Sequence, residues 1–288
     1  MSAERTRPGP VVTGFDGSPE ARRAVRWAAA EAKARGLGLV LACCIREAAE
    51  ARPAEQQLAS AAEALNRDDP GLEVGTLVRD GTPEEVLTAV ADETDAAMIV
   101  LGESHTGMFT RAVTGSTESG VTRTAGRPVV VVRGEQPPPD GPVILGTDGS
   151  EQSAQAAGFA FDFAARHGLA VHAVHVARMP IWGPASEPLL GGPVLDPSPG
   201  LPQEVADELV ARQLKPWQER YPDVAVEMVH GVGPAAQALT VQSSEAALLV
   251  VGRSDHGDLR RLLLGSISDD ALHHAHCPVA VVRAQPVG

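Results

Sequence analysis

Three short motifs occur twice in this 288-residue chain, in the same order. VVTGFDGS (11–18) matches VILGTDGS (143–150), LGESHTGMFTRAVTGS (101–116) matches VGRSDHGDLRRLLLGS (251–266), and RPVVVVR (127–133) matches CPVAVVR (277–283). An internal repeat constrains the architecture more than any local pattern, because each copy must fold as one structural unit. The chain is therefore expected to contain two copies of one domain, as its length also suggests.

Each copy alternates short apolar runs with alanine-rich helical stretches. The strands are predicted at 11–15, 39–45, 72–78, 97–101 and 128–132, and again at 143–147, 170–177, 224–230, 247–251 and 278–282. The helices are predicted at 18–34, 54–67, 83–92 and 115–125, then from 150, at 203–219, from 233 and at 265–275. Continuously apolar strands are buried on both faces, as in a parallel sheet covered by helices. We predict an α/β fold of two tandem Rossmann-like domains, each a five-stranded parallel sheet flanked by helices.

The domain limits follow from the repeat. The first domain is expected over 1–133 and the second over 143–288, joined by a linker at 134–142 that three successive prolines stiffen. The spacing between the copies grows from 132 residues at the DGS motif to 150 at the glycine motif, so the second copy carries 18 extra residues. We place this insertion in the Pro- and Gly-rich stretch 179–202, a loop that is either functional or a plain surface insertion.

Composition limits the class of partner. A formal net charge of −13 argues against binding the phosphate backbone of a nucleic acid. No apolar run approaches the ~18 residues that cross a membrane, and the first ten residues lack the apolar stretch of a secretory signal. The three cysteines, Cys43, Cys44 and Cys277, are too few for a disulfide framework and are expected to be reduced. A cytoplasmic protein is expected.

The DGS motif offers a candidate binding group in each copy. In open α/β sheets, ligands bind beyond the carboxyl ends of the strands. Asp16 and Asp148 end the first strand of each copy, just after Gly14 and Gly146, and directly precede a helix. A carboxylate there could bond an adenine amine or a ribose hydroxyl. The same D-G-S sequence is also good turn and helix-cap chemistry.

The glycine motif begins where the fourth strand ends, with identical spacing in both copies. Its members are Gly102, Gly107, Gly115 and Ser116 in the first copy, and Gly252, Gly257, Gly265 and Ser266 in the second. Glycine lets the backbone approach a phosphate closely, and the N–H groups at the following helix start favour an anion. An ordinary loop framed by glycines and followed by a helix cap would have a similar sequence.

Strand–DGS–helix, then G-x2-G-x9-G-[ST], then a helix and PVVVVR resembles the universal stress protein family in its tandem form. The resemblance implies five-stranded, adenine nucleotide α-hydrolase-like domains, many of which bind ATP with little or no hydrolysis. It implies that the two aspartates contact adenine or ribose, that Cys44 and Val176 lie against the base, and that the glycine motif holds ribose and phosphates. It also implies a pseudo-dimer within the chain, whose last strands meet. Whole chains could pair further as homodimers.

The copies depart from the family pattern at its second glycine, which is His105 in the first and Asp255 in the second. Both side chains add bulk near the ligand. Asp255 would repel phosphates by roughly 1–4 kcal/mol unless Mg²⁺ intervenes, whereas a protonated His105 would attract them. We therefore expect two inequivalent nucleotide sites, the first including His105 and the second including Asp255.

Catalytic signatures are missing from the sequence. It contains neither the P-loop pattern nor a G-x-S-x-G elbow, and the glycine motifs hold no Lys. The cluster His273, His274, His276 and Cys277 is interpreted as a helix end instead of a metal site. The resemblance, together with these missing motifs, leads us to expect an ATP-binding regulatory stress-response protein that is not an enzyme. A nucleotide-free interaction protein, or a nucleotide hydrolase or nucleotidyl transferase, remain as alternatives.

Overall fold

The structure, a computed structural model, describes residues 9–103, 117–133, 140–177, 203–253 and 266–283. The first half contains β1 (Gly9–Gly14), α1 (Pro19–Arg35), β2 (Leu39–Ile45), η1 (Ala48–Glu50), α2 (Ala51–Asp68), β3 (Val74–Asp80), α3 (Pro83–Glu93), β4 (Ala96–Gly102), α4 (Thr117–Thr124) and β5 (Val129–Val132). The second half contains β6 (Val143–Gly146), α5 (Glu151–His167), β7 (Val171–Ala177), α6 (Gln203–Arg220), β8 (Val226–Val232), α7 (Ala235–Gln242), η3 (Ser243–Glu245), β9 (Leu248–Arg253), α8 (Ser266–His274) and β10 (Val279–Arg283).

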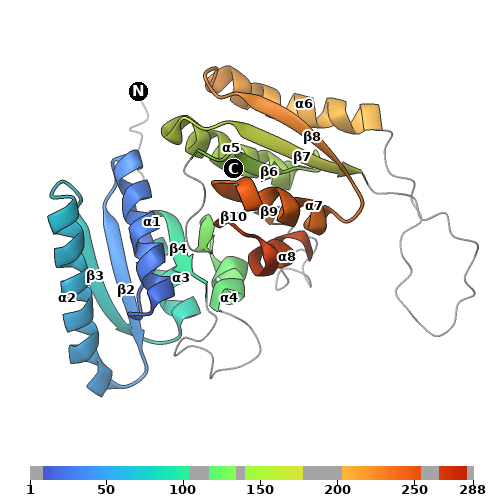
Figure 1. Cartoon of the computed structure of the whole chain (residues 1–288). Helices are drawn as coiled ribbons and strands as arrows, with labels where there is room; N and C mark the ends of the chain where they lie inside the picture. The colour runs from blue at the N-terminus through green and yellow to red at the C-terminus, as the bar shows by residue number, and fades with distance from the viewer. Residues whose placement is uncertain (1–8, 104–116, 134–139, 178–202, 254–265, 284–288) are drawn as a thin grey trace, which may run out of the picture.

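The strands of both halves form one ten-stranded sheet in the order β3-β2-β1-β4-β5-β10-β9-β6-β7-β8 (Figure 1). Within each half all neighbouring strands are parallel, which confirms the two predicted five-stranded parallel sheets. β5 and β10 pair antiparallel at the centre, with Val130 opposite Ala280. The expected meeting of the last strands is thereby confirmed. Because the junction is antiparallel, the strands of the two halves end at opposite edges of the sheet.

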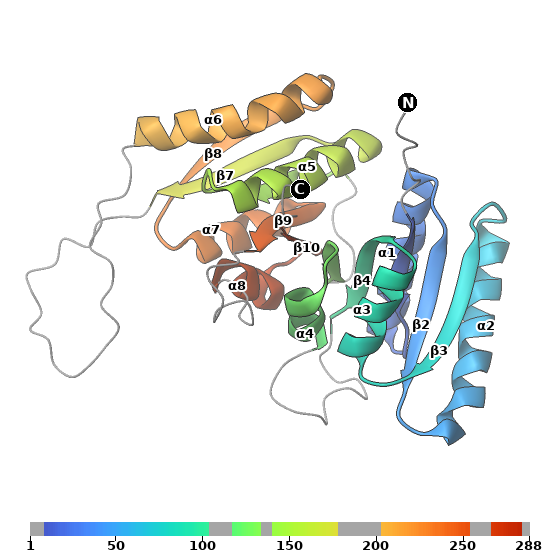
Figure 2. The ribbon, with the colours of Figure 1, turned by 180° about the vertical axis from the view of Figure 1, so that it is seen from behind.

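Helices cover both faces of this sheet (Figure 2). Each face has its own apolar core. One core lies under α1, α2, α5 and α6 and includes Leu58, Phe161 and Leu214. The other lies under α3, α4, α7 and α8 and includes Leu87 and Leu239. Valine, leucine, isoleucine and alanine make up most of both cores, in keeping with the low aromatic content of 3%.

The helices that follow the first strand of each half begin at the predicted serines and end at glycines. Ser18 Oγ accepts from the Ala21 N–H at 3.1 Å, and Pro19 occupies the first turn. Ser150 Oγ likewise accepts from the Ser153 N–H at 3.3 Å. Gly36 and Gly168 end the two helices in the left-handed conformation, with φ of 64° and 66°.

The third strand of each half begins two residues later than predicted. The prediction placed these strands at 72–78 and 224–230, but β3 and β8 begin at Val74 and Val226. The reason is that Leu72 and Val224 are apolar residues of tight turns, whose N–H groups bond the carbonyls of Asp69 and Tyr221 at 3.1 Å. Both side chains are buried, so the apolar run extends beyond the strand.

A charged network joins α1 of the first half to α5 of the second. Glu31, which is 1% exposed, accepts from Arg35 Nε, and its Oε2 lies 2.8 Å from His167 Nε2. Arg35 Nη1 also donates to Asp162 Oδ2 at 2.6 Å, and Arg166 pairs with the same carboxylate. Long-range ion pairs of this kind hold the last turns of the two helices together.

Candidate functional site

The two DGS motifs form the same turn at the end of the first strand of each half. The Ser18 N–H donates to Asp16 Oδ1, and the Ser150 N–H donates to Asp148 Oδ1, both at 3.0 Å. Gly17 and Gly149 between them have φ of 79° and 76°, which favours glycine. The turn interpretation is therefore correct for both aspartates. The turn uses only one oxygen of each carboxylate. It therefore does not compete with a ligand for the second oxygen of the same carboxylate.

The environment of Asp148 keeps its carboxyl ionised. Burial raises its pKa, but hydrogen bonds from Ser150 and Ser153 outweigh this effect, and the net pKa is lowered. An ionised carboxylate is an acceptor only, which suits an adenine amine or a ribose hydroxyl.

The end of the second strand lies beside the turn. Cys44 and Val176 occupy equivalent positions at the ends of β2 and β7, and both are half-buried against the core under α3 and α7. Burial, together with the nearby charges of Cys43 and Asp16, raises the pKa of Cys44 to about 12. The Phe15 N–H, directly before Asp16, donates to the Ala42 carbonyl of β2 at 2.9 Å, which places the turn beside the end of that strand.

The raised pKa values predict slow thiol chemistry. Burial raises the pKa of Cys277 to about 12 and also raises that of Cys43. Relative to the ordinary value of 9.0, a pKa of 12 leaves about a thousandfold less thiolate at neutral pH. We expect iodoacetamide at pH 7.5 to label the native chain far more slowly than the urea-unfolded chain, with labelling accelerating as pH rises. Rapid native labelling at Cys44 would contradict this.

Gly102 allows the end of β4 to contact the first turn of α1. A Cβ atom on this residue would lie 2.6 Å from the carbonyl carbon and oxygen of Glu20. Gly14 and Gly146 are less tightly packed than Gly102. A Cβ atom there would approach the side chains of Leu87 and Leu239 at 3.3 and 3.1 Å. These contacts hold the strand end, the helix start and the DGS turn together at one edge.

The turn of the second half carries a polar network. Gln213 of α6 bonds Thr147 Oγ1 at 3.1 Å through its Oε1, and its Nε2 donates to the Ser150 carbonyl and to Ser153 Oγ. The first half has Phe15 at the position of Thr147, with the Arg22 guanidinium 5.8 Å from the ring centroid. The two strand-end sites are therefore surrounded by different chemistry.

Two arginines link the strand ends of one half to the other half. Arg133 bonds Glu103, the residue after Gly102, and donates to carbonyls at the end of α8. Arg253, the residue after Gly252, donates to carbonyls in the last turn of α4. Sequence reasoning missed these contacts. The only sequence signal is that Glu103 and Arg253 occupy equivalent positions with opposite charge.

Several predicted site residues lie outside the described part of the chain: His105, Gly107, Gly115, Ser116, Asp255, Gly257 and Gly265, as does the insertion at 179–202. Of the Gly-Ser pair at the end of the second glycine motif, the structure describes only Ser266, which is the first residue of α8. Within the described ranges, no group of three His, Cys, Asp or Glu side chains is arranged to hold a metal. No helix in those ranges is long and apolar enough to span a membrane.

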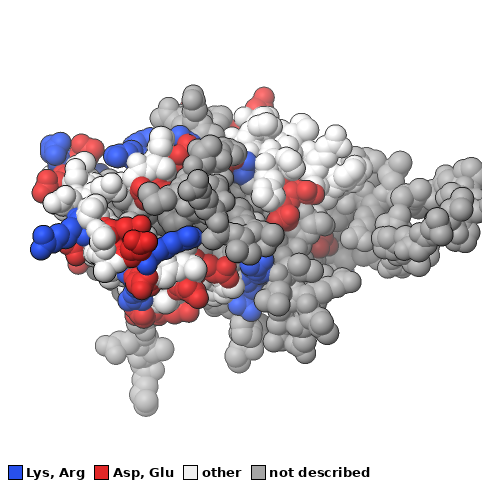
Figure 3. All heavy atoms as spheres, turned by 90° about the horizontal axis from the view of Figure 1, so that it is seen from below, with Lys and Arg blue, Asp and Glu red and all other residues white. Residues whose placement is uncertain are grey.

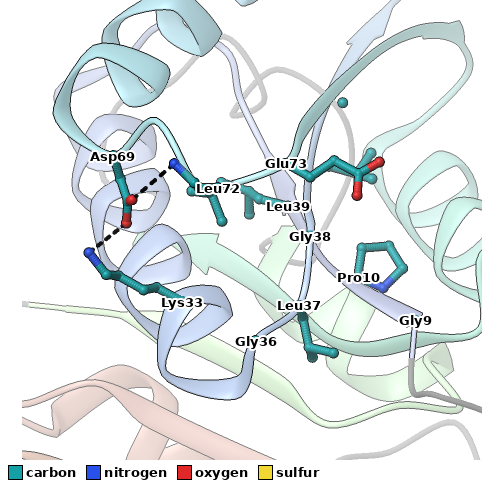
Figure 4. A pocket seen from close by; sticks show the side chains of 13 residues that line it. Gly9, Pro10, Lys33, Gly36, Leu37, Gly38, Leu39, Asp69, Leu72 and Glu73 are labelled. Atoms are coloured by element: carbon teal, nitrogen blue, oxygen red, sulfur yellow. Dashed lines mark hydrogen bonds and ion pairs between the residues drawn. The ribbon is translucent and has the colours of Figure 1, made fainter.

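A hollow of about 660 Å³ lies at the other edge of the first half (Figure 4). It is lined by Gly9, Pro10, Gly38 and Glu73, among others, where β1 and β2 begin. On one side of it, Lys33 Nζ pairs with Asp69 Oδ2 at 2.7 Å, so this cation is already neutralised (Figure 4). The hollow lies at the amino ends of the strands, away from the predicted binding edge.

Charge is mixed on the surface near the strand ends. On the face drawn in Figure 3, the described Lys and Arg side chains lie among Asp and Glu instead of forming a basic surface. The view agrees with the acidic composition of the chain.

Comparison with known proteins finds the same repeat. The model of the Universal stress protein family matches residues 9–133 and again 141–283. The chain is 34% identical over 305 residues to universal stress protein Rv2005c of Mycobacterium tuberculosis, covering 98% of this chain and 99% of the relative. It is 33% identical to a universal stress protein of Mycolicibacterium smegmatis, covering 95% and 96%.

A solved structure agrees with this fold. The crystal structure of a universal stress protein from Archaeoglobus fulgidus superimposes with a TM-score of 0.70 at 16% identity, covering 98% of both chains. The two family matches, the whole-length relatives and the duplicated strand-end turn show that the chain belongs to the universal stress protein family, in its tandem two-domain form.

Proposed function

We propose that this protein binds an adenine nucleotide, ATP with Mg²⁺, at the carboxyl edge of each half, and acts as a regulatory stress-response module. The observation that carries the proposal is the turn built twice at the strand ends. In each half it presents an aspartate beside the end of the second strand and the glycine that ends the fourth. The family resemblance supports ATP as the ligand.

Each group has a role in holding the proposed nucleotide. The carboxylate oxygen of Asp16 or Asp148 that the turn N–H does not use accepts from the adenine amine or a ribose hydroxyl. Cys44 or Val176 supplies an apolar wall for the base. The N-terminal turns of α4 and α8, which begin at the Gly-Ser pairs or directly after them, favour the phosphates.

Binding is proposed to occur with little or no hydrolysis. Phosphoryl transfer depends on cations that neutralise the transferring group, and the glycine motifs provide no Lys for this purpose. Release of inorganic phosphate from ATP at several turnovers per minute would instead favour the enzyme alternative.

Calorimetric titration with ATP–Mg²⁺ tests the proposal. We expect two sites in the wild-type chain, one each in Asp16→Ala and Asp148→Ala, and none in the double variant. Asp16→Asn separates charge from turn formation, because its amide oxygen can still accept from the Ser18 N–H. Asp68→Ala, an exposed aspartate of α2, is the matched control and should retain both sites. A wild-type chain without saturable heat at millimolar ATP would identify a nucleotide-free interaction protein.

A further inference from the structure

Two nearly buried arginines cross between the halves, and each ends on the last turn of the other half's final helix. Arg253 Nη1 donates to the carbonyls of Thr122 and Arg123 in α4, at 2.8 and 2.6 Å. Arg133 donates to the carbonyls of Ala275 and His273 at the end of α8, at 3.2 and 3.0 Å. Arg253 is 4% exposed and Arg133 is 9% exposed. Charge-assisted bonds to carbonyls at a helix end are strong, and they favour a fixed helix position.

The other ends of the same helices lie at the proposed nucleotide sites. α4 begins at Thr117, directly after the Gly-Ser pair of the first glycine motif, and α8 begins at Ser266, the serine of the second pair. They are 8 and 9 residues long, so only about 12–14 Å separates the two ends of each helix at 1.5 Å per residue. The helices also contact each other at the junction of the halves, as Figures 1 and 2 both show.

Each arginine is attached to the strand end of its own half. Arg253 directly follows Gly252 at the end of β9. Arg133 follows β5 and is paired with Glu103, which directly follows Gly102. The antiparallel pairing of β5 with β10 produces this arrangement, because it places the carboxyl ends of β5 and β9 beside the final helix of the other half. A short chain of contacts therefore runs from each site to the other.

We propose that the two nucleotide sites are coupled through these contacts, so that a nucleotide bound in one half raises the affinity of the other half. In this proposal Arg253 and Arg133 are positioning residues, and the coupling rests on the proposed nucleotide binding. A nucleotide that fixes the first turn of α4 also fixes the carbonyls that Arg253 binds, and with them the strand end at Gly252. The second nucleotide then binds to a strand end that is already ordered. Its binding costs less conformational entropy, and the coupling is therefore positive. Linkage requires the effect to be reciprocal.

A purely structural role makes different predictions. If the arginines only fasten the halves together, their removal lowers stability but transmits no effect of ligand. The deciding observation is therefore a change in one half that depends on nucleotide in the other.

The experiment uses the full chain with Asp148→Ala, which leaves only the first site. Amide hydrogen exchange is measured with and without saturating ATP–Mg²⁺, and the readout is β9, which belongs to the other half. We expect ATP to slow exchange at the end of β9 about fivefold. In the same background, Arg253→Gln should weaken ATP binding at the first site by about fivefold and abolish the slowing in β9. Arg253→Lys, which keeps the charge, should restore part of both effects.

Arg212→Gln, an exposed arginine on α6 of the same half, is the matched control and should change neither result. Exchange in β9 that is indifferent to ATP, in a chain that binds ATP at its first site, overturns the coupling and leaves the proposed function standing. This comparison needs no Arg253 variant, so it holds even if Arg253→Gln fails to fold. A wild-type chain that binds no ATP overturns both proposals.

Discussion

Replacing Glu31 with alanine is expected to destabilise the folded chain by about 3 kcal/mol. Glu31 is 1% exposed and lies between Arg35 of its own helix and His167 of the other half. Removing one member of a buried ion pair usually costs about 3–5 kcal/mol, because its partners stay desolvated. We place the loss at the lower end, since Arg35 retains Asp162 as a second partner.

Urea unfolding at neutral pH measures this loss. Glu31→Gln should fall between wild type and Glu31→Ala, because its amide oxygen can still accept from Arg35. Glu63→Ala, on the exposed side of α2, makes the same substitution outside the network and should cost no more than about 0.5 kcal/mol. Equal losses for Glu31→Ala and Glu63→Ala would show that the network does not hold the halves together.

Gly102→Ala is expected to damage both stability and the first nucleotide site. The new Cβ would lie 2.6 Å from the Glu20 carbonyl and 2.9 Å from the Ala21 nitrogen, so backbone must move. Overpacking of this kind costs about 1–3 kcal/mol. The same movement displaces the start of α1 from the end of β4. We therefore expect ATP binding at the first site, measured in the Asp148→Ala chain, to weaken about tenfold, equivalent to about 1.4 kcal/mol.

Gly75→Ala provides the matched control. Gly75 lies on the edge strand β3, and a Cβ there would meet Val40 at an ordinary contact distance of 3.7 Å. This variant should keep wild-type stability within about 0.5 kcal/mol and wild-type ATP affinity. If Gly102→Ala behaved like Gly75→Ala, the close approach of β4 to α1 would not define the site.

Much of the fold could be predicted because the signals are local and occur twice. Apolar runs, the serine caps and the DGS turns each depend on a few neighbouring residues, and the structure confirms them. The third strands were placed two residues early because burial alone cannot distinguish a core-filling turn residue such as Leu72 from a strand residue.

The contacts between the halves could not be predicted in the same way. Glu31 stands in an alanine-rich helix that resembles any solvated helix in sequence, and its partner His167 is 136 residues away. Arg133 and Arg253 bind backbone carbonyls of the other half. Every residue has such a carbonyl, so the sequence does not indicate which ones accept these bonds. Their roles depend on the antiparallel junction, which only the three-dimensional arrangement reveals.

A crystal structure of the full chain grown with a non-hydrolysable ATP analogue and Mg²⁺ tests the proposed sites most directly. We predict one nucleotide beside Asp16 and Cys44 and another beside Asp148 and Val176, at opposite edges of the ten-stranded sheet. Nucleotide found only in the hollow beside Lys33, or at neither strand edge, would contradict this prediction.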